Sequence, residues 1–125
     1  MTNNPSAPQI APEGRIRRSY LFVPGARPDR FAKALAAGAD AVIIDLEDAV
    51  SPTDKDSARA AVCAFLRDRT GSDAAAPDIF VRTNSLRSRT GLLDLLALTD
   101  LDAGQAPPWA GLLLPKVDGA ADVRL

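Results

Sequence analysis

The 125-residue sequence contains no histidine and one cysteine, Cys63. Without histidine, this chain alone cannot form a Ser-His-Asp triad or a histidine-containing zinc site, so any metal would need oxygen ligands. A single cysteine cannot form an internal disulfide, which fits a reducing compartment. We therefore expect a cytoplasmic protein.

Long apolar runs and an excess of charge of one sign are also lacking. No stretch approaches the roughly 20 apolar residues of a membrane span, and no apolar core of a signal peptide follows the N-terminal charges. Fifteen basic and sixteen acidic residues give a net charge of -1, which offers no basis for a nucleic-acid partner. The balanced charge instead favours small-molecule chemistry, and with 46% hydrophobic residues the chain can bury a core.

Short, branched apolar runs recur after an N-terminal segment without periodicity. We expect residues 1–16 to form a disordered leader and residues 17–125 to form the folded part. Runs of this kind are typical of strands buried on both faces of a parallel sheet. The predicted strands are Tyr20–Val23, Ala41–Ile44, Ile79–Arg82 and Ala110–Lys116.

Helical patterns separate these strands. Pro28 can open the first helix and Gly38 can end it, while Ser51 and Asp54 predict a capping box for the second helix. The second helix carries an apolar stripe of Ala58, Ala61, Val62, Phe65 and Leu66. Cys63 lies off this stripe, and we assign it no role. A leucine-rich third helix spans about 92–101. Asp118 is predicted to cap a fourth helix. Four strands that alternate with helices predict parallel strands joined by right-handed crossover connections.

Charged residues follow three of the predicted strands at the point where each apolar run stops. Asp45, Glu47 and Asp48 follow the second strand, Arg82 ends the third, and Lys116 ends the fourth. In α/β folds the chemistry lies at the carboxyl ends of parallel strands. We therefore expect Asp45, Arg82 and Lys116 to meet at the same edge of the sheet, as parts of an active site.

The acidic cluster has two interpretations. If the chain stays extended, Asp45 and Glu47 share one face and could converge on a metal-bound water or on a proton to be moved. Alternatively, these acids cap the next helix or pair with basic side chains. We favour a catalytic role for Asp45, leave Glu47 open between the two, and treat Asp48 as structural.

Arg82 is the strongest candidate for a ligand contact. Its planar guanidinium can bind a carboxylate through two bonds, and at the end of a buried strand it needs a partner. That partner is either a substrate carboxylate or Asp45, and Asn84 could present its amide to the same side. Lys116 could orient an anionic substrate or stabilise an enolate, or it could pair with Asp118.

Five segments, in order, resemble the citrate lyase beta subunit and its relatives in the HpcH/HpaI aldolase superfamily. They are RSYLFVPG at 18–25, RPDRF at 27–31, GADAVIIDLEDAV at 38–50, VRTN at 81–84 and LPKV at 114–117. The long third segment is the most specific of the five. The resemblance implies a (β/α)8 TIM barrel, an α/β fold of which this chain supplies about the first four βα units.

The resemblance also implies a reaction. Members of this superfamily cleave a 3-hydroxyacyl-CoA thioester to acetyl-CoA and a 2-oxoacid, with Mg²⁺ chelating the oxoacid. By the same resemblance, Arg82 binds the carboxylate of the oxoacid and Arg18 lies near CoA. Asp45 and Glu47 support the network of water molecules around the metal. We take Asp45, Glu47 and Lys116 as catalytic candidates, and Arg82 and Arg18 as substrate-binding candidates. We expect the metal ligands beyond the end of this chain.

Length leaves two interpretations open. A (β/α)8 barrel typically needs about 250 residues, roughly twice the 125 present. In the first interpretation the chain is the N-terminal half of a lyase. In the second it is a non-catalytic half-barrel that must pair with another copy or a partner, because its first and last strands would expose open edges. We expect a homo-oligomer, with neither nucleic acid nor membrane as a partner.

Overall fold

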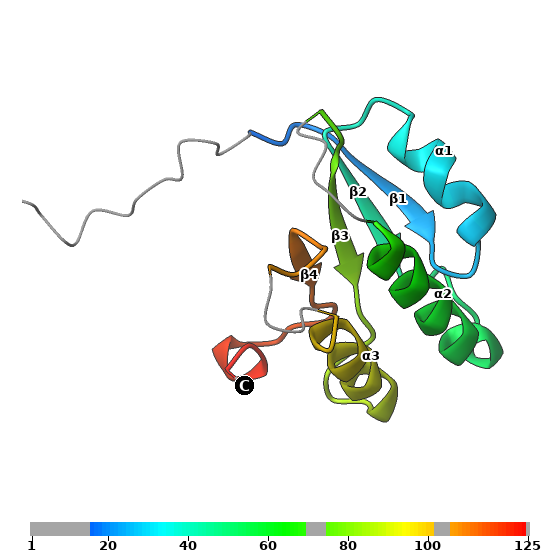
Figure 1. Cartoon of the computed structure of the whole chain (residues 1–125). Coiled ribbons are helices and arrows are strands. Elements are labelled where there is room, and N and C mark those ends of the chain that lie inside the picture. Colours follow the sequence, from blue (N-terminus) through cyan, green and yellow to red (C-terminus); the bar gives the residue numbers. More distant parts are fainter. Residues whose placement is uncertain (1–15, 70–74, 102–105, 125) are drawn as a thin grey trace, which may run out of the picture.

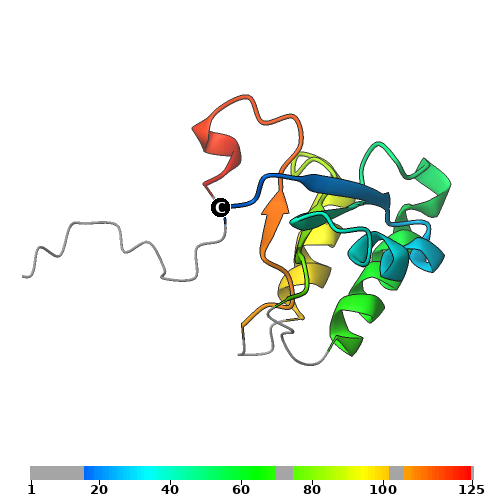
Figure 2. The ribbon, with the colours of Figure 1, turned by 90° about the horizontal axis from the view of Figure 1, so that it is seen from above.

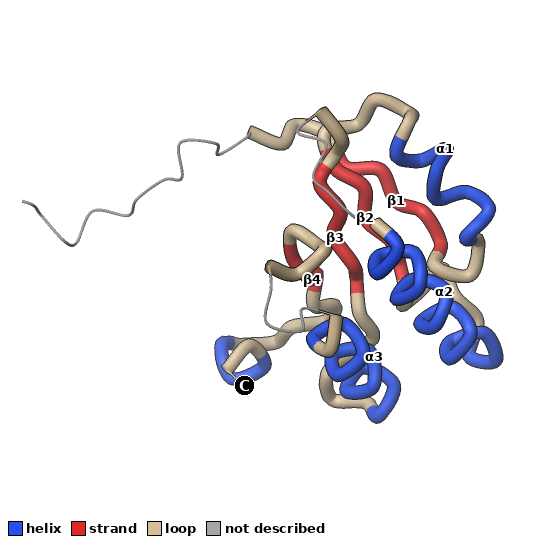
Figure 3. Tube along the Cα trace, in the orientation of Figure 1, coloured by secondary structure: helices blue, strands red, loops and turns tan. Residues whose placement is uncertain are grey.

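The computed structural model describes residues 16–69, 75–101 and 106–124 (Figure 1). Apart from Ile16, the leader expected at residues 1–16 lies outside these ranges. Strands and helices alternate along the described chain, as Figure 3 shows. This alternation confirms the predicted α/β class.

The sheet contains four parallel strands in sequential order, β1-β2-β3-β4. Their bounds are β1 Tyr20–Pro24, β2 Ala41–Asp45, β3 Asp78–Arg82 and β4 Gly111–Leu113. Three strands match the prediction within one residue at each end. The fourth is shorter than expected, because Pro115 lacks an N–H for the ladder and Lys116 adopts a positive φ of 52°.

Each connection between strands carries a helix. A 3₁₀ turn at Pro28–Arg30 leads into α1 Phe31–Leu35, and a second at Pro52–Asp54 leads into α2 Lys55–Asp68. The third helix, α3, spans Arg89–Thr99, and a short 3₁₀ turn occupies Ala120–Asp122. Gly38 has a φ of 94°, which fits its predicted role of ending the first helical segment.

The three α-helices lie against one face of the sheet (Figure 2), and the hydrophobic core fills the space between them and that face. Alternate strand residues point into it: Val23 of β1, Val42 and Ile44 of β2, and Ile79 and Val81 of β3. The helices contribute Phe31, Ala34, Ala58, Val62, Cys63, Leu66 and Leu98. Because the crossovers place every helix on this face, the other face of the sheet carries none of the three.

The buried face of α2 differs from the predicted apolar stripe, which left out Cys63. Its side chain is buried within the core cluster, whereas Ala61 and Phe65 of the expected stripe are only half-buried. The buried face of α2 is rotated toward Cys63 because α2 packs against α3 as well as against the sheet. Phe65 instead meets the Phe31 ring edge-on, with the two ring centroids 5.0 Å apart.

Two predicted helix caps are wrong. Ser51 makes no capping bond to backbone; its hydroxyl donates to the Asp54 carboxylate at 2.8 Å, because the chain enters α2 through a 3₁₀ turn. Asp118 precedes Gly119, the residue that caps the last 3₁₀ turn, and its carboxylate lies 3.0 Å from the Arg87 guanidinium. The side-chain cap that does form was not predicted: Ser88 accepts a bond from Gly91 N at 3.0 Å and starts α3.

The helix-free face of the sheet carries aromatic side chains, and arginine guanidinium groups lie over two of their rings. Tyr20 and Phe22 of β1 are 48% and 50% exposed, and Tyr20 packs against Phe80 of β3. The Arg17 guanidinium lies over the Phe80 ring, and the Arg82 guanidinium lies over the Phe22 ring, each 5.0 Å from the ring centroid. Among the described residues, none of the helices has the length and apolar character needed to cross a membrane.

Candidate active site at the carboxyl edge of the sheet

Asp45 and Arg82 are the last residues of β2 and β3 and are direct partners in the sheet register. Lys116 follows β4 and reaches the same edge, where its ammonium contacts Glu47. The predicted meeting of Asp45, Arg82 and Lys116 at one edge is therefore confirmed. We call Asp45, Glu47, Arg82 and Lys116 the carboxyl-edge cluster.

A two-bond ion pair joins Asp45 and Arg82. The Arg82 Nε donates to Asp45 Oδ1 at 2.8 Å, and Nη2 donates to Oδ2 at 2.7 Å. The Asp45 carboxylate also accepts bonds from the backbone N–H groups of Glu47 at 2.9 Å and Ala49 at 3.0 Å. Of the two partners predicted for Arg82, the structure shows Asp45.

The electrostatics of this pair keep both groups ionised. Burial alone would raise the pKa of Asp45, but the bonds from Arg82 and from the backbone N–H groups of Glu47 and Ala49 outweigh it and lower that pKa. The bond to Asp45 raises the pKa of Arg82. An aspartate held in this state is a poor proton donor near neutral pH.

The backbone after β2 is folded tightly around Asp45. Val50 N donates to Glu47 O at 3.1 Å, and the Lys55 ammonium donates to the carbonyl oxygens of Leu46 and Glu47. Gly25, the residue directly after β1, donates its N–H to Asp45 O at 2.7 Å. A Cβ at Gly25 would lie 2.8 Å from that oxygen, so this approach requires glycine.

Glu47 lies between two cations of the cluster. Its Oε2 is 2.8 Å from the Lys116 ammonium, and its Oε1 is 3.8 Å from Arg82 Nη1. The chain turns after Asp45 instead of staying extended, yet the nearly buried Glu47 side chain returns to the same edge. The exposed Asp48 contributes a weaker contact to Lys116 at 3.6 Å.

Lys116 reaches Glu47 from an unusual backbone conformation. With a φ of 52°, it is the one non-glycine residue of the described chain with a positive φ. The bond to Glu47 raises the pKa of Lys116 and keeps its ammonium charged. The alternative pairing with Asp118 is wrong, because Asp118 contacts Arg87.

Arg18 and Asn84 do not join the cluster. Arg18 precedes β1, at the amino end of the sheet, with its side chain 83% exposed and its Nε 3.5 Å from Asp40. The length of β1 separates this position from the carboxyl edge by about 20 Å. Asn84 is buried, and its side-chain Nδ2 donates to Leu46 O at 2.9 Å and to Asp94 Oδ2 at 2.7 Å.

Sequence reasoning missed Asp94 and Phe22. Asp94 is fully buried and ties α2 to α3 by accepting a 2.7 Å bond from Arg59 Nε. The sequence did contain a signal for Asp94, a single acid within the leucine-rich run of α3. A carboxylate buried at such a position needs a bonding partner. The Arg82 guanidinium lies over the ring of Phe22, which the alternation along β1 places on the helix-free face.

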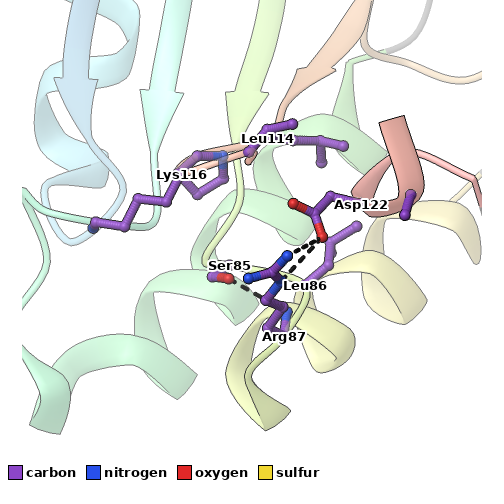
Figure 4. Close-up of a pocket in the computed structure, with 9 residues that line it drawn as sticks. Ser85, Leu86, Arg87, Leu114, Lys116 and Asp122 are labelled. Carbon is purple, nitrogen blue, oxygen red and sulfur yellow. Dashed lines mark hydrogen bonds and ion pairs between the residues drawn. The ribbon is translucent and has the colours of Figure 1, made fainter. Parts of the chain in front are cut away.

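A small pocket of about 200 Å³ borders the cluster (Figure 4). Its walls come from the β3–α3 connection and the segment after β4, and include Ser85, Leu86, Arg87 and Asp122. Within the pocket, Arg87 Nη2 forms an ion pair with Asp122 Oδ1 at 2.7 Å. The Lys116 side chain extends away from Arg87 and Asp122, toward β2. Within the described part of the chain, histidine, cysteine and acidic side chains form no group of three or more that could hold a metal ion.

Comparison with known proteins identifies the family. A family model described as HpcH/HpaI aldolase/citrate lyase matches residues 18–125, so the chain belongs to this family. It is 38% identical to the L-malyl-CoA/beta-methylmalyl-CoA lyase of Cereibacter sphaeroides over 92% of this chain and 34% of that protein. It is 38% identical to the citrate lyase subunit beta of Escherichia coli over 87% of this chain and 33% of that protein.

Solved structures agree with this assignment. The citrate lyase beta subunit of Mycobacterium tuberculosis, complexed with oxaloacetate and magnesium, matches with a TM-score of 0.61 and 42% identity over 83% of this chain and 40% of that one. The protein CitE of the same organism, in complex with magnesium, acetoacetate and coenzyme A, matches with a TM-score of 0.63 and 40% identity. This match covers 86% of this chain and 36% of that one. The chain spans about a third of its curated relatives, at 34% and 33%. The predicted family and its barrel-type parallel sheet are confirmed for this N-terminal part.

The conformation of Lys116 gives a test of the site geometry. Lys116→Ala and Lys116→Gly both remove the bond to Glu47, but only glycine relaxes the left-handed backbone. We expect the Gly variant to be more stable than the Ala variant by about 1 kcal/mol in urea unfolding. An Ala variant as stable as the Gly variant would show that Lys116 does not hold the positive φ.

Proposed function

We propose that the protein carrying this sequence is a carbon–carbon lyase that cleaves a 3-hydroxyacyl-CoA thioester to acetyl-CoA and a 2-oxoacid. This chain would supply the N-terminal part of its barrel. The observation that carries the proposal is the Arg82 guanidinium, fixed by Asp45 at the carboxyl edge of a parallel sheet of this family. That edge is where barrel enzymes place their chemistry.

Arg82 is proposed to bind the carboxylate of the oxoacid. A guanidinium has five N–H groups, and two of those in Arg82 are bonded to Asp45. Within the described residues the other three make no hydrogen bond, since the Glu47 oxygen nearest Nη1 is 3.8 Å away. A carboxylate can bind there without breaking the ion pair with Asp45.

In the proposed reaction, the bond between the α-carbon of the acyl-CoA and the hydroxyl-bearing carbon breaks. The hydroxyl loses its proton as the 2-oxo group forms, and the electron pair passes to the thioester enolate, which takes up a proton to give acetyl-CoA. Lys116, kept cationic by Glu47, is proposed to stabilise that developing charge. Glu47 is proposed to orient Lys116 and nearby water, and Asp45 to act through Arg82.

Mg²⁺ is the proposed cofactor, which would chelate the oxoacid and stabilise negative charge on it. The described residues do not fit a complete magnesium site. Asp45 already accepts bonds from Arg82, Glu47 N and Ala49 N, and Glu47 is paired with Lys116. We propose that the metal ligands come from the part of the relatives that this chain does not cover.

Further parts of the proposal concern CoA, location and assembly. The exposed Arg18 stays a predicted contact for CoA. Burial raises the pKa of the Cys63 thiol, so this thiol stays protonated and unreactive, and the cytoplasmic location stays a prediction from the sequence. A homo-oligomer is supported by Leu92 and Leu96 of α3, which are 48% and 60% exposed.

The half-barrel interpretation is the second candidate. The observation that favours it is that β1 and β4 each pair with one strand only among the described residues, while β1 leaves Tyr20 and Phe22 half-exposed. Such edges promote pairing with another chain. The molar mass of the isolated chain in solution, taken together with a lyase assay, separates this candidate from the first.

We expect Arg82→Lys in the complete enzyme to weaken oxoacid binding at least roughly tenfold. Lysine keeps the charge but loses the planar geometry, and each charge-assisted bond is worth about 1.5–3 kcal/mol. Arg17→Lys, at the amino end of the sheet, is the matched control and should bind normally. Isothermal titration with oxaloacetate and glyoxylate measures the effect, and unchanged affinity in Arg82→Lys would sink the assignment.

We also expect the isolated 125-residue chain to lack appreciable lyase activity, even with Mg²⁺ and thioester present. The acids of the carboxyl-edge cluster are already bonded within the chain, so the metal lacks ligands. The assay is acetyl-CoA release from malyl-CoA and citryl-CoA, with Mg²⁺ binding followed by calorimetry. Mg²⁺-dependent turnover in the range of about 1–10³ s⁻¹ would contradict this expectation.

A further inference from the structure

The hydrogen bonds of Asp45 limit what it can do chemically. An ionised carboxylate has about four positions for accepting hydrogen bonds. In Asp45, Arg82 Nε and Nη2 and the N–H groups of Glu47 and Ala49 fill that number, at 2.7 to 3.0 Å. The carboxylate is 2% exposed. To bind a metal or accept a proton, it would have to give up one of these bonds inside the protein.

The same contacts leave Arg82 little freedom to rotate. Asp45 holds one edge of the guanidinium through Nε and Nη2, and the Phe22 ring lies 5.0 Å from Cζ on one face. The remaining edge, at Nη1, faces Glu47 at 3.8 Å. Two contacts from different strands, the ion pair with Asp45 and the contact with the Phe22 ring, therefore restrict the guanidinium.

We propose that Asp45 is a positioning residue, which orients Arg82 so that its Nη1 edge receives the ligand carboxylate, and that Phe22 supports the same orientation. The ligand part of this proposal rests on the proposed function; the orientation of Arg82 by Asp45 does not. Asp45 then contributes to affinity through a second residue, without touching the substrate. This role differs from the direct catalytic role that the sequence suggested.

The chain contains a matched control at the other end of the sheet. Arg17 Nε donates to Asp78 Oδ2 at 2.7 Å, and the Arg17 guanidinium lies 5.0 Å from the Phe80 centroid. Arg17, Asp78 and Phe80 thus form a similar but looser arrangement, with one bond to a carboxylate whose side chain is 31% exposed, against two bonds and 2% at Asp45. Because this copy lies at the amino end, Asp78→Asn removes the same kind of contact away from the carboxyl edge.

The experiment compares Asp45→Asn with Asp78→Asn in the complete enzyme with Mg²⁺ present, with arginine side chains labelled with ¹⁵N. The heteronuclear NOE of each Nε–H reports its order, and titration with pyruvate reports carboxylate binding. We expect Asp45→Asn to release the Arg82 Nε–H while Arg17 stays ordered, and to weaken pyruvate binding by roughly tenfold. Asp78→Asn should release Arg17 only and bind pyruvate normally.

Two results would overturn the positioning role: an Arg82 Nε–H that stays ordered in Asp45→Asn, or pyruvate affinity unchanged although that order is lost. If Asp45→Asn does not fold, the wild-type chain decides, because an Arg82 Nε–H as mobile as that of the exposed Arg18 contradicts the proposal. Arg82→Lys separates the two claims. If it leaves pyruvate affinity unchanged, the proposed function fails, while the order of Arg82 still tests the role of Asp45.

Discussion

The ion pair between Asp45 and Arg82 is the interaction on which the rest of the carboxyl edge depends. It joins the last residues of β2 and β3, which are also paired in the sheet. The same carboxylate accepts bonds from Glu47 N and Ala49 N and so shapes the turn that leads toward α2. An unpaired charge at this depth would be strongly destabilising, so the strand ends and the turn depend on the ion pair being intact.

Charges at this edge alternate from the ion pair outward. Arg82 lies between Asp45 and Glu47, and Glu47 lies between Arg82 and Lys116. Short and long contacts alternate along this series: two bonds of 2.7 and 2.8 Å join Asp45 to Arg82, 3.8 Å separates Arg82 from Glu47, 2.8 Å separates Glu47 from Lys116, and 3.6 Å separates Lys116 from the exposed Asp48. This order leaves the Nη1 edge of Arg82 and the Lys116 ammonium as the cationic groups available to an anionic ligand.

The sheet could be predicted from sequence because apolar runs such as 41–44 end in charges, and because parallel strands bring those ends together. The length of β4 could not, since it depends on the positive φ of Lys116. Burial of Cys63 required knowing that α2 also packs against α3. Within the site, the two-bond geometry between Arg82 and Asp45 could not be predicted, because it depends on side-chain conformations that residue types alone do not specify.

The most direct test of this account is a double-mutant cycle on the unfolding free energy with Asp45→Asn, Arg82→Gln and the double variant. The exposed pair Arg87 and Asp118 provides the reference cycle. We expect a coupling of at least about 1.5 kcal/mol between Asp45 and Arg82, against less than about 1 kcal/mol for the exposed pair. A coupling no larger than that of the exposed pair would contradict the central place given to this interaction.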